Sequence, residues 1–267
     1  MLSFMPTASL NGTELHYRDS GTSKNVVLLL HAFPLHSGMW ARQIAALERT
    51  HRVVAPDYRG LGKSGLPPEG WTLELLVQDI RALLSHLRIE RAAVAGMSMG
   101  GYVAFELYRQ APALFRGLAL CDTKAADDTE EAKENREKFA KNAIEKGLGW
   151  VADEMLPKLL KPNPDPAVVK EVRAFITDGT PAGVAAAQRA MARRPDSTAT
   201  LAGVTCPVLV VTGEQDVMMP FAEAEKMTLA VKGAKLVKIP GAGHLPCLEN
   251  PEAFTRTLVD FFGALPA

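Results

Sequence analysis

The sequence predicts an α/β fold: a mostly parallel, twisted sheet with an opening antiparallel hairpin and an all-helical insertion before the last strands. Continuous apolar runs alternate with amphipathic helical segments, which is typical of parallel strands covered by helices on both faces. Residues 7–18 alternate around Asn11-Gly12, the strongest short signal for a hairpin. Residues 123–201 show helical patterns and no convincing strand. We therefore expect a core of residues 1–122 and 202–267 that carries a helical lid at 123–201.

The expected strands and helices alternate along the chain at the short spacing of βα units. The strands expected in the parallel sheet are residues 26–30, 52–56, 91–95, 117–121, 207–212 and 235–239. The helices expected outside the insertion are 38–49, 72–87, 102–111, 221–231 and 251–262, and shorter ones are expected inside it at 167–177 and 181–192. Residues 128–146 are strongly charged, and Lys133 with Glu137 and Glu134 with Lys138 have the spacing of ion pairs one turn apart.

Composition excludes several classes of partner. Lys plus Arg and Asp plus Glu both number 30, so the formal net charge of zero gives no electrostatic case for nucleic acid or an anionic membrane surface. No apolar run reaches the ~18 residues of a spanning helix, and the first residues lack the basic region of a signal peptide. The three cysteines have no C-x-x-C spacing, which favours free thiols. We expect a soluble cytoplasmic protein, a monomer or homodimer, that needs no metal or cofactor.

The stretch Gly96-Met97-Ser98-Met99-Gly100 lies between an apolar strand and a helical segment. This strand–turn–helix context is the one that a G-x-S-x-G nucleophile elbow requires. Ser98 must adopt a strained backbone there to expose its oxygen, and the glycines allow the strand and helix to approach closely. We expect Ser98 to be a catalytic nucleophile.

A serine hydroxyl needs a base, and an imidazole base needs a carboxylate that holds its tautomer. His244 lies in a glycine-containing loop between the last strand and the last helix, and Asp216 lies in the loop after an earlier strand. Asp122, at the end of the strand before the insertion, is the alternative acid. His31 and His36 precede Ser98 in the chain, so we favour His244 as the base and Asp216 as its partner.

An oxyanion needs two backbone donors. The helix N-terminus supplies the N–H of Met99, and the loop after the first parallel strand supplies that of Phe33, since Pro34 has none. The substrate pocket is expected to include Met97, Met218 and Met219.

Two other stretches have structural interpretations. Asp57 and Arg59 precede the elbow and are expected to pin their own loop by pairing. Residues 60–64 resemble a phosphate-binding loop but lack the G-x-x-x-x-G-K-[ST] spacing, so nucleotide binding is not expected.

With these loops, the chain resembles the serine-dependent α/β-hydrolase family over essentially its whole length, in the family's order of Ser98, Asp216 and His244. Residues 57–64 are similar to the family's D-x-R-G-x-G-x-S loop, and Ala32 replaces the glycine of its H-G-x-P motif. Three stretches, at 121–125, 131–136 and 194–198, look like those of bacterial carboxylesterases that act on short acyl esters.

The resemblance implies a carboxylic-ester hydrolase that acts on a small-molecule ester through an acyl-enzyme. A serine at the elbow argues against haloalkane dehalogenases and epoxide hydrolases, which use aspartate there. An enol-lactonase or carbon–carbon bond hydrolase with the same triad stays open, as does, more remotely, a ligand-binding receptor on the same fold. Cationic residues facing Ser98 would favour an anionic substrate, and Lys124 and Arg194 are the charges to inspect.

Overall fold

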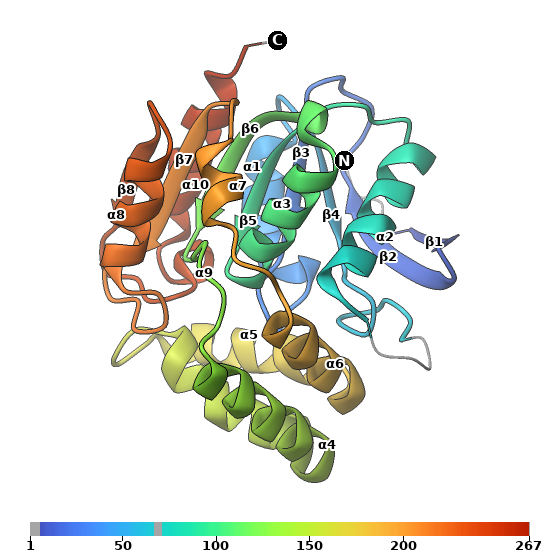
Figure 1. Ribbon diagram of the computed structural model, residues 1–267, viewed down its shortest axis with the longest axis vertical. Coiled ribbons are helices and arrows are strands. Elements are labelled where there is room, and N and C mark those ends of the chain that lie inside the picture. The colour runs from blue at the N-terminus through green and yellow to red at the C-terminus, as the bar shows by residue number, and fades with distance from the viewer. Residues whose placement is uncertain (1–5, 67–70, 267) are drawn as a thin grey trace.

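The computed structural model describes residues 6–66 and 71–266. These residues form an eight-stranded sheet in the order β1-β2-β4-β3-β5-β6-β7-β8 (Figure 1). The β1–β2 and β2–β4 pairs are antiparallel, and all the other pairs are parallel. The strands are β1 (Thr7–Leu10), β2 (Thr13–Asp19), β3 (Val26–Leu30), β4 (Arg52–Pro56), β5 (Ala92–Met97), β6 (Phe115–Cys121), β7 (Val208–Gly213) and β8 (Lys235–Ile239).

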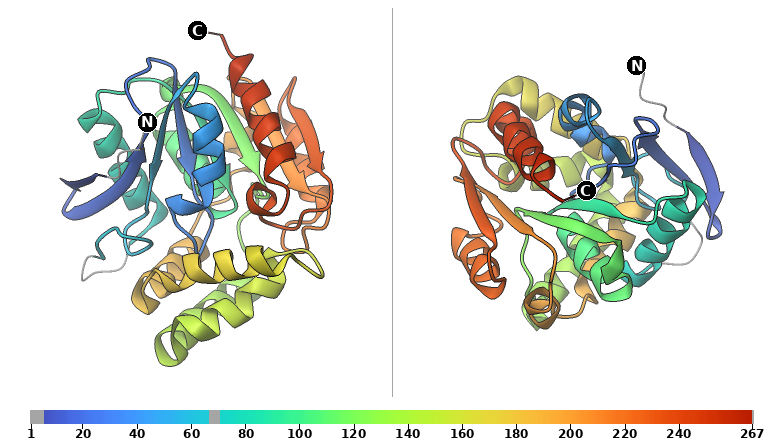
Figure 2. Two further views of the ribbon diagram at one scale, coloured as in Figure 1. Left: turned by 180° about the vertical axis from the view of Figure 1, so that it is seen from behind. Right: turned by 90° about the horizontal axis from the view of Figure 1, so that it is seen from above.

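Helices cover both faces of the sheet. One face carries α1 (Ala41–Leu47) and α10 (Pro251–Gly263), and the other carries α2 (Leu73–His86), α3 (Met99–Gln110) and α8 (Phe221–Ala230) (Figures 1 and 2). Every residue of β3, β5 and β7 is buried, as continuous apolar runs in a parallel sheet predict. Short helical turns complete the core: η1 (Ser37–Trp40), η2 (Pro112–Leu114) and α9 (Pro246–Glu249).

Between β6 and β7 the chain forms α4 (Glu130–Leu159), α5 (Pro166–Thr177), α6 (Pro181–Ala192) and α7 (Thr198–Ala202). Helices α4, α5 and α6 lie together beyond one end of the sheet (Figures 1 and 2). Helix α4 is kinked at Gly147, whose φ is 76°. The helical character predicted for this insertion is therefore correct, while its role as a lid stays a prediction.

The ion pairs predicted within α4 are wrong. Lys133 bonds to Glu130 at 2.7 Å, and Glu137 bonds to Arg189 of α6. Exposed lysines have many partners within reach at similar energy, so spacing along one helix does not decide between them.

Candidate active site

Ser98 lies at the turn from β5 into α3, as the sequence predicts. Its φ of 54° and ψ of −114° fall in a region that side chains rarely occupy, and its backbone N–H donates to the carbonyl of Cys121 at 2.9 Å. Such a conformation costs about 1–3 kcal/mol and persists only where the surroundings impose it. The side chain opens into a cavity between the sheet and the inserted helices.

Glycines make this turn possible. A Cβ atom on Gly96 would lie 2.3 Å from the carbonyl oxygen of Gly100, and one on Gly100 would lie 2.1 Å from the carbonyl oxygen of Leu30. Both contacts are with backbone, which cannot rotate away. The close approach of α3 to β5 and β3 therefore depends on glycine at both positions.

His244 lies in the loop between β8 and α9 and is fully buried. Its Nδ1 atom is 2.7 Å from Oδ2 of Asp216, while Oδ1 of Asp216 accepts from the backbone N–H groups of Met218 and Met219 at 2.8 and 3.1 Å. Its Nε2 atom is buried without a hydrogen-bond partner among the described residues. A carboxylate that holds the proton on Nδ1 leaves Nε2 as an acceptor, which is the tautomer a general base requires.

The environment keeps the Asp216 carboxylate ionised. Burial raises the pKa of Asp216, but the His244 ring and the two backbone N–H groups outweigh burial and hold the pKa below its usual range. An ionised carboxylate both orients the imidazole and stabilises its protonated form.

Asp122, the alternative acid, lies beside this pair but has a different environment. Its Oδ1 accepts from the backbone N–H of Gly213 at 2.7 Å, and its Oδ2 is buried without a partner among the described residues. Burial and the nearby charge of Asp216 raise the pKa of Asp122 well above its usual range, which favours the protonated acid. Between the two carboxylates, only Asp216 has a hydrogen bond to the imidazole.

Asp122, Asp216 and His244 are also the one group of potential metal ligands found among the described residues, with ligand atoms within 4.8 Å of one another. The hydrogen bond between His244 and Asp216 already engages one atom of each. That hydrogen bond explains why the ligand atoms of His244 and Asp216 lie close together.

The carboxyl ends of adjacent strands bring Ser98 to the same region. The carbonyl of Cys121, at the end of β6, accepts from Ser98 N–H, and the N–H of Asp122 donates to Val211 of β7 at 2.9 Å. Residues far apart in the sequence therefore meet at one edge of the sheet, as parallel topology requires.

The two amides predicted to hold an oxyanion are both available. Met99 N–H is the first of α3, and Phe33 follows β3 across a loop whose peptide bond to Pro34 is cis. Neither N–H donates a hydrogen bond to any described residue. Phe33 also lines the cavity that contains Ser98.

That cavity has a volume of about 330 Å³. Of the three methionines expected in the substrate pocket, Met218 and Met219 line this cavity and Met97 does not; that substrate binds there stays a prediction. Met97 is fully buried in the core, where its sulfur lies 3.7 Å from that of Cys247. The expectation that Met97 lines this cavity is wrong: Met97 is the last residue of β5 and directly precedes Ser98, and successive side chains of a strand point to opposite faces.

The structure also corrects which charges face this cavity. Neither Lys124 nor Arg194 lines it, whereas two other cations, Arg136 and Lys158 of α4, do. The uncharged Tyr102 of α3 lines it as well. Sequence reasoning missed all three. Tyr102 lies four residues after Ser98 on the same helix face, so helical spacing could have identified it.

The remaining polar candidates have structural partners. Asp57 contacts His16 at 2.8 Å and accepts from Ser37 N–H, whereas Arg59 pairs with the buried Asp79. Each of them anchors the 57–65 loop, although they do not pair with each other.

His31 is buried with both ring nitrogens engaged. Nδ1 contacts the carbonyl of Ala32 at 3.0 Å, and Nε2 accepts from Tyr58 N–H at 3.1 Å. Burial lowers the pKa of His31 to about 4. The ring is therefore a neutral structural group.

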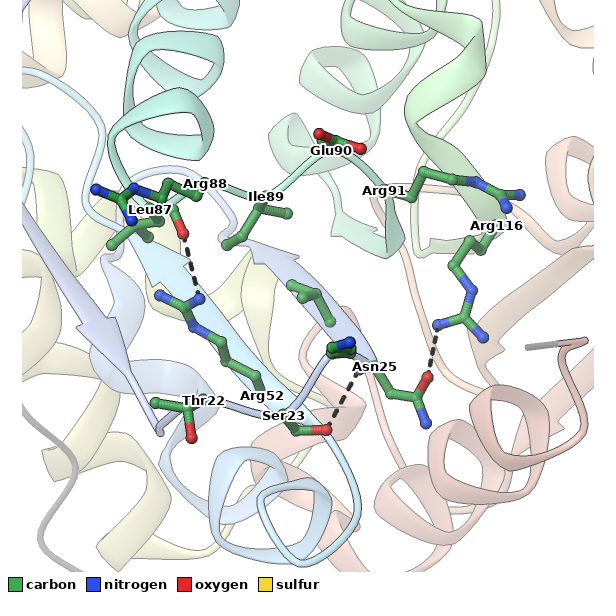
Figure 3. Close-up of a pocket in the computed structure, with 12 residues that line it drawn as sticks. Thr22, Ser23, Asn25, Arg52, Leu87, Arg88, Ile89, Glu90, Arg91 and Arg116 are labelled. Atoms are coloured by element: carbon green, nitrogen blue, oxygen red, sulfur yellow. Dashed lines mark hydrogen bonds between the residues drawn. The ribbon is translucent and has the colours of Figure 1, made fainter.

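A larger cavity, of about 680 Å³, lies elsewhere. It is bordered by the amino ends of the parallel strands, and Arg52, Arg88, Arg91 and Arg116 surround it (Figure 3). Arg52 donates to the carbonyl of Leu87 and Arg116 to the side chain of Asn25, both at 3.3 Å. Ser98 follows the carboxyl end of β5, so this cavity belongs to the opposite edge of the sheet.

A family model described as the alpha/beta hydrolase family matches residues 27–257. The chain belongs to this family. The solved structure of a thermophilic esterase from Thermogutta terrifontis, with malate bound, is 38% identical, covers 98% of both chains and superposes with a TM-score of 0.93. An enol-lactonase from Burkholderia xenovorans LB400 is 32% identical over 97% of this chain and all of its own, with a TM-score of 0.89.

The sequence relatives of this hydrolase are more varied and include enol-lactonases, a methyl ester esterase and a soluble epoxide hydrolase. A 3-oxoadipate enol-lactonase from Acinetobacter baylyi is 26% identical over 96% of this chain and 95% of its own length.

Among the described residues, no helix combines the length and apolar character that crossing a bilayer would demand.

Proposed function

We propose that this hydrolase is a carboxylesterase that cleaves short-chain acyl esters through Ser98, His244 and Asp216. The observation that carries the proposal is the hydrogen bond between His244 Nδ1 and Asp216, together with a strained serine that opens into a bounded cavity. The likeness to the Thermogutta terrifontis esterase supports the same activity.

In the proposed mechanism, Ser98 Oγ attacks the ester carbonyl and its proton passes to Nε2 of His244. The carbonyl oxygen becomes an oxyanion, which the N–H groups of Phe33 and Met99 hold. The protonated imidazole then gives its proton to the departing alcohol, leaving an acyl-enzyme. Water attacks this ester, His244 accepts the water's proton, and Ser98 leaves with a proton as the acid is released.

The helices of residues 123–201 would act as a lid in this scheme. Phe139 and Met155 of α4 and Met191 of α6 contribute apolar side chains to the cavity wall. Phe33, Met218 and Met219 of the core also line it. A cavity of about 330 Å³ suits a small ligand better than a long acyl chain.

Enol-lactone hydrolysis is the second candidate, because a cationic side chain, Arg136, lines the cavity and enol-lactonases are among the relatives. The chemistry would be the same, except that the leaving oxygen stays joined to the acyl group. The side chains that line the pocket, and not the triad, would decide between an ester and an enol-lactone as substrate.

A scan of p-nitrophenyl esters from acetate to decanoate tests the proposal. We expect kcat/KM to peak at short chains and an acyl-enzyme to be trapped on Ser98 by a fluorophosphonate. Weak turnover of every ester, with rapid hydrolysis of an enol-lactone, would replace the esterase by the lactonase.

A further inference from the structure

Besides Ser98, five polar or charged side chains line the cavity among mainly apolar ones. These are Tyr102 of α3, Asn135, Arg136 and Lys158 of α4, and Gln188 of α6. None of them has a role in the triad chemistry. Tyr102 and Gln188 are buried, whereas Arg136 is partly exposed and Asn135 is exposed. A buried polar group is costly unless something pairs with it, so the unpartnered hydroxyl of Tyr102 requires an explanation.

Arg136 is held in place by two of its three nitrogens. Nε donates to the carboxylate of Asp128, and Nη1 donates to Gln188 Oε1 at 2.9 Å. Nη2 donates no hydrogen bond to any described residue. An arginine fixed in this way keeps part of its planar donor edge free for a ligand.

Tyr102 supplies a second unused donor. Its side chain is almost fully buried, and its Oη atom has no hydrogen-bond partner among the described residues. The guanidinium of Arg194 stacks on the ring with its centre 4.1 Å from the ring centroid. This packing holds the ring, and Tyr102 is one of the residues that line the cavity.

The charges around Arg136 do not cancel. Asp128 is buried and forms ion pairs with Arg136, Arg194 and Lys124, three cations around one carboxylate. Burial raises the pKa of Asp128, but the hydrogen bonds from Arg194 and Arg136 outweigh it and keep the carboxylate ionised. Asp128, Arg136, Arg194 and Lys124 together carry a net positive charge near the cavity, which the carboxylate of Asp127 beside Arg194 offsets only in part. A net positive charge there favours an anion.

We propose that Arg136 and Tyr102 form a subsite for a carboxylate at the end of the substrate remote from the scissile carbonyl. This inference rests on the proposed hydrolysis at Ser98 and names its substrate class: monoesters of short dicarboxylic acids, or lactones with a carboxylate side arm. Arg136 would take the carboxylate through its free edge, and Tyr102 would donate its hydroxyl proton in a hydrogen bond.

The chain contains a matched control. Arg136 of α4 bonds to Gln188 of α6, and Arg189 of α6 bonds to Glu137 of α4 at 2.9 Å. Both arginines bridge the same two helices, but Arg189 does not line the cavity. If Arg136 served only to brace the insertion, the two substitutions would act alike.

The experiment compares kcat/KM for a monomethyl dicarboxylate series, from succinate to pimelate, with that for methyl alkanoates of the same acyl lengths. We expect wild type to prefer the charged member of at least one pair. Arg136→Met should lower the charged-to-neutral ratio by about 10- to 100-fold, as expected for a lost charge-assisted hydrogen bond, and Tyr102→Phe by about 3- to 10-fold. Arg136→Lys should retain part of the preference, and Arg189→Met should retain all of it.

A wild-type ratio near one at every chain length, or an equal fall in Arg136→Met and Arg189→Met, would overturn the subsite. Binding separates this failure from failure of the proposed function. Calorimetric titration of Ser98→Ala protein with glutarate and adipate should show binding that is lost in Ser98→Ala/Arg136→Met, even if no ester is turned over. Dicarboxylate affinity that does not depend on Arg136 would contradict the inference.

Discussion

His244 Nδ1 lies 2.7 Å from Asp216 Oδ2, whereas Asp122, which lies beside both residues, bonds to the backbone of Gly213 instead. Two carboxylates of similar position therefore have different states. Asp216 has three donors and a lowered pKa, and Asp122 has one donor and a raised pKa. Environment, and not residue type, separates the two groups.

Asp216→Asn should lower kcat by about 10³- to 10⁴-fold, because an amide can hold the imidazole in the wrong tautomer and cannot stabilise its charge. Asp122→Asn should change kcat by less than about tenfold, since the amide oxygen can still accept from Gly213 N–H. Steady-state ester hydrolysis of both variants measures the difference. The reverse ranking would move the acid to Asp122.

Gly100→Ala should destabilise the protein by about 3 kcal/mol or more, because the added methyl group would meet the Leu30 carbonyl. Gly149→Ala is the control. It lies in α4 with open space around the added carbon, so we expect a gain of about 0.5–1 kcal/mol. Urea unfolding of the two variants checks this contrast, and equal effects would contradict it.

Ser98→Gly should be more stable than Ser98→Ala by about 1 kcal/mol, because glycine tolerates the positive φ at this turn without strain. Both variants lack the hydroxyl, so the comparison isolates the backbone. Thermal melting of Ser98→Gly and Ser98→Ala measures this difference in stability. A more stable alanine variant would mean that the turn holds no strain.

Stability should fall between pH 6.5 and about 4 as His31, neutral in the folded protein, becomes protonated in the unfolded chain. The unfolded state binds the extra proton in this window, so stability rises with pH across it and is fully present above it. The full effect is about 3 kcal/mol, from a pKa lowered from 6.5 to about 4.

His31→Gln provides the test, since the glutamine oxygen can accept from Tyr58 N–H but cannot titrate. Its unfolding free energy, measured by urea denaturation at several pH values, should depend less on pH in this window than that of wild type. His86→Asn is the control, because His86 is exposed. An unchanged slope in His31→Gln would assign the pH dependence to His36 and His51, whose pKa values burial also lowers.

Local patterns predicted most of the fold. The apolar runs 26–30, 52–56 and 235–239 are β3, β4 and β8 without a change of boundary, and Thr72 caps α2 by accepting from Leu75 N–H at 3.3 Å. Short elements such as α7 and α9 were not predicted, since four or five residues carry too little periodicity to identify a helix.

The relative positions of the inserted helices could not be predicted. Which side chains of α4 face Ser98 depends on how α4 packs on α6, and no local pattern encodes that contact. The sequence therefore indicated Lys124 and Arg194 as the charges near Ser98. These two side chains pair with Asp128 instead, and Arg136 lines the cavity. The burial of His51 likewise depends on a contact that no local pattern encodes, since Phe262 of α10 packs against its ring.

Hydrolysis of p-nitrophenyl butyrate by wild type and Ser98→Ala tests the central claim most directly. The account predicts serine-dependent turnover, with kcat/KM reduced on the order of 10⁴-fold or more in the variant and the circular dichroism spectrum unchanged. Ester hydrolysis retained by a folded Ser98→Ala protein would contradict the assignment of Ser98 as the nucleophile.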